Sequence, residues 1–384
     1  MKIVADANIP FVEQCFSSIG QVEVVPGRQI TRGAVADADI VVVRSITPVN
    51  ASLLEGTAVK FVGTSTIGFD HIDRDFLAAN NIGFASAPGS NANSAAEYVI
   101  AGLLDTAQKY DIDLDEKSIG IIGAGNVGSR VEKKAAALGI DVVLNDPPLE
   151  RETRDDKYRP LEELFGCDFI TIHTPLTFEG IDKTYHLADS SFFDSLKERC
   201  VFINASRGAV VETDALKNAI LSGRLRGVVL DVWENEPDID LTLLKMVDIG
   251  TPHIAGYSLD GKIAGMTMIY KAVCEYFDIE PTFDARDFLP APPIHELRLN
   301  VHQDRPVDIL AGAVQKIYDI RRDDTRLRWI WEKPEHKRAE YFDNLRKDYP
   351  VRRELHNTTV LLGSGDIALE RKLAGIGFNV QRFG

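Results

Sequence analysis

The sequence predicts an α/β fold built on parallel sheets, and three observations lead to this prediction. Short apolar runs alternate with helix-like segments for about the first 280 residues, which is the pattern of parallel strands joined by helices. A glycine-rich turn, Gly123–Gly128, follows one of these runs and precedes a helix-like segment. The chain has 384 residues, more than one hydrophobic core usually serves, so we expect two or three domains.

The first series of elements is expected to form an N-terminal domain. Its predicted buried strands are Lys2–Asp6, Ile40–Arg44, Phe61–Gly63 and Phe84–Ser86. The segment Ser94–Tyr110 is rich in alanine and leucine and predicts a long helix, which Asn93 or Ser94 would cap. This helix would lead from the first domain into the second.

A second series of strands follows, with the glycine-rich turn after its first member. The predicted strands are Ser118–Gly123, Asp141–Asn145, Phe169–His173, Val201–Ala205, Gly227–Asp231 and Val247–Gly250. They fit a complete dinucleotide-binding sheet. After Tyr257 the chain is expected to be helical to about Phe277 and to return to the first domain. We therefore expect a discontinuous substrate-binding domain of residues 1–92 and 257–280, a nucleotide-binding domain of residues 93–256 inserted in it, and an active site in the cleft.

The remaining residues, 281–384, are expected to form a third, smaller domain. Pro281 and the proline-rich stretch Leu289–Pro293 predict a linker. A charged helical stretch lies around Arg321–Asp324, and then Thr358–Leu362, a helix and Gly377–Gln381 form another β-α-β pattern. Such an additional domain most often provides an oligomerisation surface.

Composition and charge exclude several classes of function. A net charge of −15 argues against nonspecific binding to nucleic acid and against an anionic membrane surface. The four cysteines are scattered and form neither a CxxC pair nor a metal-binding cluster, so they predict free buried thiols in a reducing compartment. No apolar run approaches the roughly 18 residues that a membrane span needs. We expect a cytoplasmic protein that binds no metal.

The glycine-rich turn has the sequence context of a dinucleotide site. Gly123 would permit the tight turn, Gly125 would let a pyrophosphate approach the backbone, and Gly128 would let the helix pack closely on the strand. Asp146 follows the next predicted strand, where a carboxylate accepts ribose hydroxyls and repels a 2′-phosphate. The pattern therefore predicts NAD rather than NADP as cofactor.

Further residues near this turn are candidates for contact with the cofactor. Asn126 and Val127 lie at the helix start, where Asn126 would either touch a phosphate or simply begin the helix. Thr174 ends another strand of the sheet and is a candidate contact. The adjacent His173 is more often a structural histidine than a catalyst, because the sequence gives it no partner, and we interpret His186 in the same way.

Three residues at successive strand ends form a candidate catalytic set. The planar fork of Arg207 would hold a carboxylate and a neighbouring oxygen together. His253 would carry a proton, and Glu236 would pair with that histidine, with Glu234 as a competing partner. Asp231, at a strand end, would bond the nicotinamide amide. Together they suit hydride transfer between a 2-hydroxy acid and a nicotinamide.

The motifs that carry these residues resemble those of the D-isomer-specific 2-hydroxyacid dehydrogenases. The similarity covers Gly123–Gly128, Ser206–Val211, Asp231–Pro237 and Thr251–Gly256, in this order along the chain. The resemblance implies that Arg207, Glu236 and His253 are the active-site residues. It also implies two Rossmann-like domains with parallel sheets around a cleft, and NAD as cofactor.

Residues of the expected substrate-binding domain narrow the choice of hydroxy acid. Ser45 follows one early strand, and a hydroxyl-rich loop follows the next. Much of the family is rich in glycine at the positions that Ser65 and Thr66 hold in this loop. These hydroxyls would suit a substrate with more oxygens than lactate, although on physical grounds they could equally cap the turn. Arg44 would bind a phosphate or form a salt bridge.

The resemblance extends over essentially the whole chain to a branch of the family that oxidises a small phosphorylated hydroxy acid. It implies substrate contacts from Ser45, Thr66 and Tyr257, and NAD contacts from Gly256 and from Asp146, Thr174 and Asp231. It also implies a small α+β C-terminal domain that forms a homodimer. Two alternatives remain open, namely a 3-phosphoglycerate or other D-2-hydroxyacid dehydrogenase, and an NAD-responsive corepressor that has kept the fold.

Overall fold

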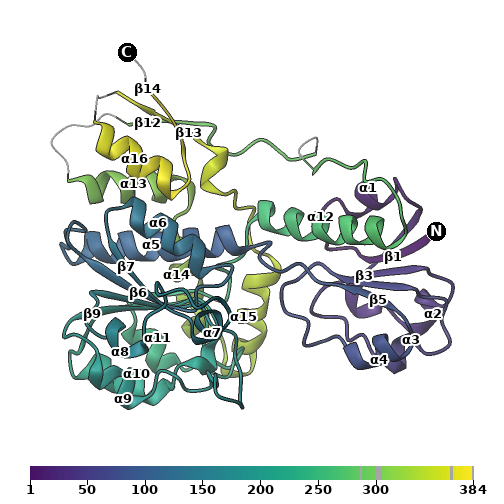
Figure 1. Cartoon of the computed structure of the whole chain (residues 1–384), viewed down its shortest axis with the longest axis horizontal. Helices are drawn as coiled ribbons and strands as arrows, with labels where there is room; N and C mark the ends of the chain where they lie inside the picture. The colour runs from purple at the N-terminus through teal and green to yellow at the C-terminus, as the bar shows by residue number, and fades with distance from the viewer. Residues whose placement is uncertain (286–287, 300–304, 364–365, 383–384) are drawn as a thin grey trace. The chain divides into compact units, whose positions relative to one another are not determined.

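The computed structural model describes residues 1–285, 288–299, 305–363 and 366–382. The chain divides into two compact units, which are drawn in Figure 1. The first unit comprises Met1–Ala92 with Ser258–Ala291, and the second comprises Asn93–Tyr257 with Pro292–Gly384. The functional domain boundaries expected at residues 92, 257 and 281 stay predictions.

The first unit is built on a five-stranded parallel sheet with the order β2-β1-β3-β4-β5. Its strands are β1 (Lys2–Asp6), β2 (Gln21–Val25), β3 (Ile40–Val43), β4 (Phe61–Thr64) and β5 (Gly83–Ala85). Its helices are α1 (Val12–Phe16), η1 (Gly27–Gln29), α2 (Arg32–Val35), α3 (Ala51–Leu54), α4 (Arg74–Ala79) and α12 (Leu259–Tyr276). The unit therefore alternates strands and helices, as the sequence predicts.

The core of the first unit explains why these segments form strands and a packed helix. Every residue of β3 is fully buried, and continuous β-branched runs of this kind are typical of strands covered on both faces. The long helix α12 packs against the sheet (Figure 1). A Cβ atom on Gly63 would lie 2.2 Å from Cγ2 of Ile269. Glycine at this position of β4 therefore lets α12 approach the sheet closely.

The second unit contains a six-stranded parallel sheet with the order β11-β10-β9-β8-β6-β7. Its strands are β6 (Ser118–Ile122), β7 (Asp141–Asn145), β8 (Phe169–Ile172), β9 (Cys200–Asn204), β10 (Leu225–Leu230) and β11 (Ile249–Gly250). Its helices are α5 (Ala92–Lys109), α6 (Gly128–Ala137), α7 (Pro147–Thr153), α8 (Leu161–Leu164), α9 (Ser190–Ser195), η2 (Gly208–Val210), α10 (Thr213–Leu221) and α11 (Leu241–Met246). Helix α5 begins two residues before the predicted start.

All six strands of this sheet end in register. The last residue of each strand is paired with the last residue of its neighbour, along the row Gly250, Leu230, Asn204, Ile172, Ile122 and Asn145. The loops that follow the strands therefore begin at one edge of the sheet. In open parallel sheets, ligands bind at this carboxyl edge.

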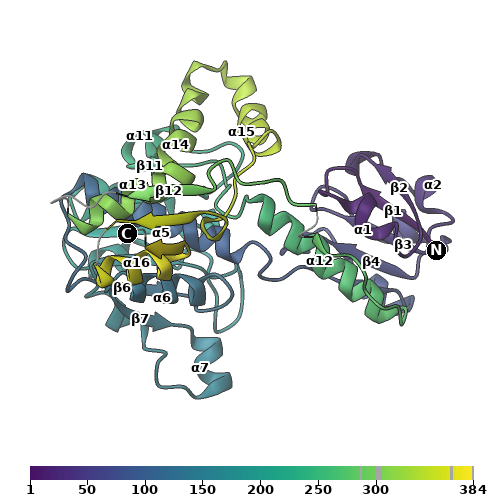
Figure 2. The same cartoon turned by 90° about the horizontal axis from the view of Figure 1, so that it is seen from above.

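The C-terminal residues form a smaller three-stranded parallel sheet with the order β12-β13-β14. Its strands are β12 (Glu296–Leu299), β13 (Thr359–Leu362) and β14 (Asn379–Arg382). The helices are α13 (Pro306–Ile317), α14 (Ile320–Arg328), η4 (Trp329–Glu332), η5 (Glu335–Lys337), α15 (Arg338–Lys347), η6 (Leu355–Asn357) and α16 (Ile367–Ile376). Helix α16 lies beside α6 (Figure 2), and a Cβ atom on Gly375 would lie 2.1 Å from Cβ of Ala137. Strand β12, like β2 of the first unit, is absent from the sequence-based prediction.

Buried charges join the C-terminal segment to helix α5. Glu97 is 1% exposed, and its Oε1 accepts hydrogen bonds from the Leu355 amide at 3.1 Å and from an Asn93 side chain. Arg352 lies 3.7 Å from Oε2 of Glu97. Burial and the nearby charge of Glu354 raise the pKa of Glu97 to about 7. This carboxyl group therefore changes its charge near neutral pH.

We expect Glu97→Gln to change how stability depends on pH. The folded protein keeps a proton on Glu97 up to about pH 7, whereas the unfolded chain loses this proton near the ordinary glutamate pKa of 4.5. This group therefore contributes fully to the free energy of unfolding at low pH. The contribution, roughly 3 kcal/mol, is lost as the pH rises through 7. Urea denaturation at pH 5 and pH 8 should show a steeper loss in the wild type than in Glu97→Gln. Identical pH dependence in both proteins would contradict this prediction.

The cysteines and the membrane prediction were also tested by the structure. All four cysteines are buried and free, which confirms the prediction of unpaired buried thiols. Among the described residues, no helix is long and apolar enough to cross a membrane. The predicted fold class, with parallel Rossmann-like sheets and a small C-terminal domain, is confirmed.

Candidate functional site

The glycine-rich turn joins β6 to α6 at the carboxyl edge of the second unit's sheet. Gly123 has a φ of +89°, which a side chain would strain, and an added Cβ would lie 2.8 Å from the carbonyl of His173. A Cβ on Gly128 would lie 1.9 Å from the oxygen of Gly123. In contrast, a Cβ on Gly125 would meet nothing within 4 Å. The turn is therefore tightly packed at its two ends and open in the middle, where a ligand has room to approach.

This contrast predicts different effects for two similar substitutions. Gly125→Ala should leave the thermal midpoint within about 2 °C of the wild type and weaken NAD binding at least about tenfold, because the methyl group occupies the open face. Gly128→Ala should lower stability by about 1–3 kcal/mol, because the turn must move. Isothermal titration with NAD and thermal unfolding measure the two effects. Equal thermal midpoints for both variants would contradict the conclusion that the turn is open at Gly125 and tightly packed at Gly128.

Asp146 lies at the end of β7, directly beside the glycine-rich turn. Its Oδ2 accepts a hydrogen bond from the Ala124 amide at 2.8 Å, and its Oδ1 caps helix α7 through the Leu149 amide at 3.0 Å. An ionised carboxylate has about four acceptor positions, and these bonds use two of them. The remaining positions are sufficient for the ribose hydroxyls of NAD.

The end of β8 places two buried polar atoms without partners next to Gly123. The Nε2 atom of His173 bonds the Thr171 hydroxyl at 2.9 Å, but its Nδ1 and the Oγ1 of Thr174 have no hydrogen-bond partner among the described residues. Because a buried polar atom without a partner is costly, a bound molecule that supplies one would be stabilised here. Desolvation lowers the pKa of His173 to about 3, so its ring is neutral.

Two other candidate contacts with the cofactor lie where helix α6 begins. Asn126 is exposed and its carbonyl accepts a hydrogen bond from Arg130 at 2.6 Å, while Val127 occupies the N-cap position of the helix. The open backbone at Gly125, the carboxylate of Asp146 and the unpaired hydroxyl of Thr174 together fit NAD. No step of chemistry depends on these contacts, which would only hold the cofactor.

The histidine and the second of the two glutamates form a pair after β10 and β11. The Nδ1 atom of His253 lies 2.8 Å from Oε2 of Glu236, whose other oxygen accepts a hydrogen bond from the Trp233 amide at 2.7 Å. Because a carboxylate only accepts hydrogen bonds, Nδ1 carries the proton and Nε2 is the nitrogen that can take another. His253 has a φ of +56°, an uncommon value for a residue with a side chain.

Arg207 is held by its own loop after β9. The side chain of Asn204 accepts hydrogen bonds from the Ser206 amide and hydroxyl and donates one to the carbonyl of Arg207 at 3.0 Å. One guanidinium nitrogen of Arg207 donates to the carbonyl of Ser206 at 2.8 Å. Within the described part of the chain, no carboxylate forms an ion pair with Arg207. The exposed guanidinium therefore keeps donors for a ligand.

Asp231 is a buried residue that shapes the turn carrying the histidine. It is 1% exposed, and its carboxylate accepts hydrogen bonds from the amides of Ile254 and Ala255 and from the Thr251 hydroxyl, at 2.6–2.8 Å. The carbonyl of Asp231 also accepts the amide hydrogen of His253. Burial raises the pKa of Asp231 above its ordinary value. Its expected contact with the nicotinamide stays a prediction.

Gly256 and Tyr257 follow directly after Ile254 and Ala255, whose amides bond Asp231. The amide of Tyr257 donates to the carbonyl of Ile254 at 2.7 Å, and its ring meets Tyr349 edge-on at 5.8 Å. Both Gly256 and Tyr257 are half-buried. Their expected contacts, with NAD and substrate respectively, stay predictions.

The other candidate substrate residues lie in the first unit. Ser45 is exposed just beyond β3. The Thr66 hydroxyl, just beyond β4, lies 2.8 Å from that of Thr64 and bonds the carbonyl of Gly68 at 3.0 Å, so it stabilises its own loop. Arg44 bonds the buried carboxylate of Asp6 at 2.8 Å. This arginine therefore forms a salt bridge, as one of the two interpretations of the sequence expected.

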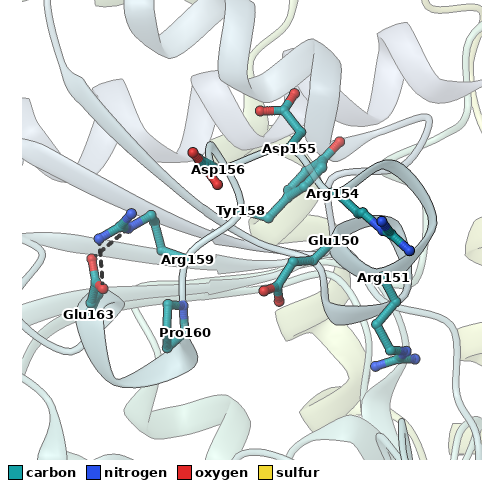
Figure 3. A pocket seen from close by; sticks show the side chains of 9 residues that line it. All are labelled: Glu150, Arg151, Arg154, Asp155, Asp156, Tyr158, Arg159, Pro160 and Glu163. Atoms are coloured by element: carbon teal, nitrogen blue, oxygen red, sulfur yellow. Dashed lines mark hydrogen bonds and ion pairs between the residues drawn. The ribbon is translucent and has the colours of Figure 1, made fainter.

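A pocket of about 490 Å³ lies beside α7 and the loop after it (Figure 3). It has three arginines and four acidic residues, and its lining consists of Glu150, Arg151, Arg154, Asp155, Asp156, Tyr158, Arg159, Pro160 and Glu163. One edge of the Arg159 guanidinium, formed by its Nε and one Nη, donates to both carboxylate oxygens of Glu163. None of the predicted site residues lines this pocket. Its nearly balanced charges give no preference for an anion.

Sequence reasoning missed two interactions that hold the site. Asn204 fixes the loop of Arg207, and the motif Asn204-x-Ser206 signals such a side-chain turn. Glu234 bonds His186 at 2.7 Å rather than His253. The sequence left Glu234 open as a competing partner of His253, and this alternative is wrong, because His253 pairs with Glu236.

Comparisons with known proteins agree with the geometry. Residues 89–255 match the NAD binding domain of the D-isomer specific 2-hydroxyacid dehydrogenases, and residues 288–377 match a domain of unknown function. The chain is 42% identical to an erythronate-4-phosphate dehydrogenase of Photorhabdus laumondii, over 99% of this chain and 100% of that protein. It is 44% identical to the enzyme of the same name from Escherichia fergusonii, over 99% of this chain and 98% of that protein.

Solved structures show the same fold over about three quarters of the chain. One is a D-lactate dehydrogenase from Aquifex aeolicus with NAD and lactic acid, with a TM-score of 0.56 and 25% identity, covering 72% of this chain and 96% of that one. Another is a 3-phosphoglycerate dehydrogenase of Entamoeba histolytica with NAD+, with a TM-score of 0.60 and 22% identity, covering 74% and 98%. The chain therefore belongs to the D-isomer specific 2-hydroxyacid dehydrogenases, NAD-dependent enzymes, and within them to the family whose members are named erythronate-4-phosphate dehydrogenase.

Proposed function

We propose that the protein oxidises 4-phospho-D-erythronate at C2 with NAD. The product would be (R)-3-hydroxy-2-oxo-4-phosphooxybutanoate, an intermediate of vitamin B6 synthesis. The observation that carries the proposal is the 2.8 Å contact between His253 and Glu236, on the same sheet edge as Arg207. The name of the curated relatives supports the choice of substrate.

Arg207 and His253 would act on different groups of the substrate, and Glu236 would assist the histidine. The fork of Arg207 would bind the substrate carboxylate and the C2 oxygen, and would stabilise negative charge on that oxygen. The free Nε2 of His253 would take the proton of the C2 hydroxyl, and Glu236 would stabilise the resulting imidazolium from the Nδ1 side.

NAD, when bound, accepts the hydride from C2. The hydrogen on C2 would leave with both electrons of the C2–H bond, the hydroxyl proton would go to Nε2 of His253, and the electron pair of the O–H bond would form the C2=O double bond, so atoms and charges balance. Gly123–Gly128, Asp146, Thr174, Asp231 and Gly256 are proposed to hold the cofactor. Ser45, Thr66 and Tyr257 are proposed to bind the substrate.

The proposed reaction is tested by identifying the keto product. The purified protein would be supplied with 4-phospho-D-erythronate and, in separate reactions, 3-phosphoglycerate and D-lactate, each with NAD and a 2-keto-acid acceptor. The acceptor allows turnover even when NAD does not leave the protein. Mass spectrometry should find keto product from phosphoerythronate alone. Product mainly from 3-phosphoglycerate would change the substrate, and NAD binding without any product would favour the corepressor.

We propose in addition that the protein forms a homodimer through residues 281–384. We also propose that it acts in the cytoplasm. Exposed apolar side chains support the dimer, because Trp329 is 51% exposed, Trp331 40% and Val351 65%. The four buried thiols support a reducing compartment. Light scattering on the full chain should give twice the monomer mass.

A further inference from the structure

The turn after β10 carries two carboxylates that point to different partners. Glu236 pairs with His253, whereas Glu234 lies 2.7 Å from Nε2 of His186. Asn235, between the two glutamates, has a φ of +63°, a left-handed conformation that turns the chain sharply. The two glutamates are thus close in sequence and serve two separate histidines.

Glu234 also holds the start of helix α10. Its Oε2 accepts hydrogen bonds from the amide and the hydroxyl of Thr213, at 3.2 and 2.8 Å. Partial burial alone would raise the pKa of Glu234, but the bonds from His186 and Thr213 outweigh it and lower the pKa. Glu234 is therefore ionised at neutral pH. Both its oxygens have protein partners, so it is not a free acid for catalysis.

His186 connects this carboxylate to the loop of Arg207. The amide of His186 donates to the carbonyl of Ala209 at 2.9 Å, and Ala188 bonds Val210 in the same way at 3.0 Å. Ala209 and Val210 belong to η2, which begins directly after Arg207. The ring of His186 is stacked on Tyr185, with the ring centroids 3.9 Å apart. The histidine is therefore fixed on one side by a ring and on the other by Glu234.

The main chains of the two loops are also in direct contact. A Cβ atom on Gly208 would lie 1.9 Å from the oxygen of Trp233 and 2.5 Å from the amide nitrogen of Glu234. The same Trp233 donates its amide hydrogen to Glu236, the partner of His253. A shift of the Trp233–Glu236 turn would therefore move both the loop of Arg207 and the carboxylate that orients the histidine.

We infer that Glu234 and His186 form a positioning pair for the hydroxy-acid oxidation. The pair holds the loop of Arg207 at a fixed place relative to the turn that carries Glu236. The guanidinium and the imidazole must address the same C2 oxygen, and misplacement by about 1 Å costs on the order of 100-fold in rate. This inference rests on the proposed function, because it concerns how the arginine and histidine act on one substrate.

The test compares Glu234→Gln with a matched control, Asp240→Asn. Asp240 also caps a helix, through the Leu243 amide at 2.8 Å, and it too has a basic side chain as partner, Lys217 at 2.9 Å. Both variants should lose a similar amount of thermal stability. Glu234→Gln should lower kcat about 10- to 100-fold and change the dissociation constant of NAD by less than about threefold. Asp240→Asn should keep kcat within about twofold of the wild type.

A double-mutant cycle with Arg207→Lys shows whether Glu234 acts through the arginine. If it does, adding Glu234→Gln to Arg207→Lys should lower kcat/KM much less than it does in the wild type. Independent, multiplicative losses would overturn the inference, as would a Glu234→Gln variant with normal kcat. A wild type that oxidises only another hydroxy acid would change the proposed substrate but not the inference, which is then measured on that acid. A wild type inactive on every hydroxy acid would overturn both.

Discussion

Replacing His253 by alanine is expected to lower kcat by about 10²- to 10⁴-fold, the usual contribution of a positioned general base. The imidazole has a carboxylate at Nδ1, 2.8 Å away, so its other nitrogen is the natural proton acceptor. Steady-state kinetics with 4-phospho-D-erythronate measure the loss. The NAD dissociation constant should change less than about threefold, because Asp231 holds the turn through backbone amides that this substitution leaves intact.

His356→Ala is the matched control, because this histidine lies in the same unit and its side chain is 53% exposed. It should keep the kinetic constants of the wild type. A His253→Ala variant that retained more than a tenth of kcat would contradict the role of general base. Equal losses of kcat and of NAD affinity would instead indicate that His253 holds the cofactor site.

The sequence predicts the second unit's sheet well, because its signals are local. Each strand is a short apolar run, and the strand, glycine turn and helix around Gly123–Gly128 follow one another directly along the chain. The predicted set of Arg207, Glu236 and His253 lies on loops after three neighbouring strands, because parallel strands all end at one edge. The geometry of a parallel sheet thus turns positions along the sequence into neighbours in space.

The partners of the side chains could not be predicted in the same way. Glu234 and Glu236 are equivalent in the sequence, and the choice between them depends on the left-handed residue Asn235 and on His186, 48 positions before Glu234. Likewise, the Thr66 hydroxyl bonds its own loop, which residue types alone do not reveal. Strands β2 and β12 were missed because polar residues alternate with their apolar ones, so neither segment is a continuous apolar run.

Replacing Arg207 by lysine is expected to lower kcat/KM for the hydroxy acid by about 10²- to 10³-fold, as when a donor to a developing oxyanion is removed. Lysine keeps the positive charge but lacks the planar fork that binds a carboxylate and a second oxygen together. The rest of the loop should survive, because Asn204 bonds the main chain at this position and not the guanidinium. The thermal midpoint and the NAD dissociation constant should therefore stay close to those of the wild type.

Arg224→Lys is the control for this substitution, because Arg224 also donates to a carbonyl, that of Leu196 at 3.2 Å. It lies directly before the start of β10, whereas Arg207 follows the end of β9. It should leave kcat/KM unchanged. If Arg207→Lys acted with full kcat/KM, charge alone would suffice and the fork would have no role. If it lost NAD affinity in proportion to kcat/KM, Arg207 would belong to the cofactor site instead. Because Arg207 has no ion-pair partner among the described residues, any loss specific to the hydroxy acid reports the arginine's own contact with the substrate.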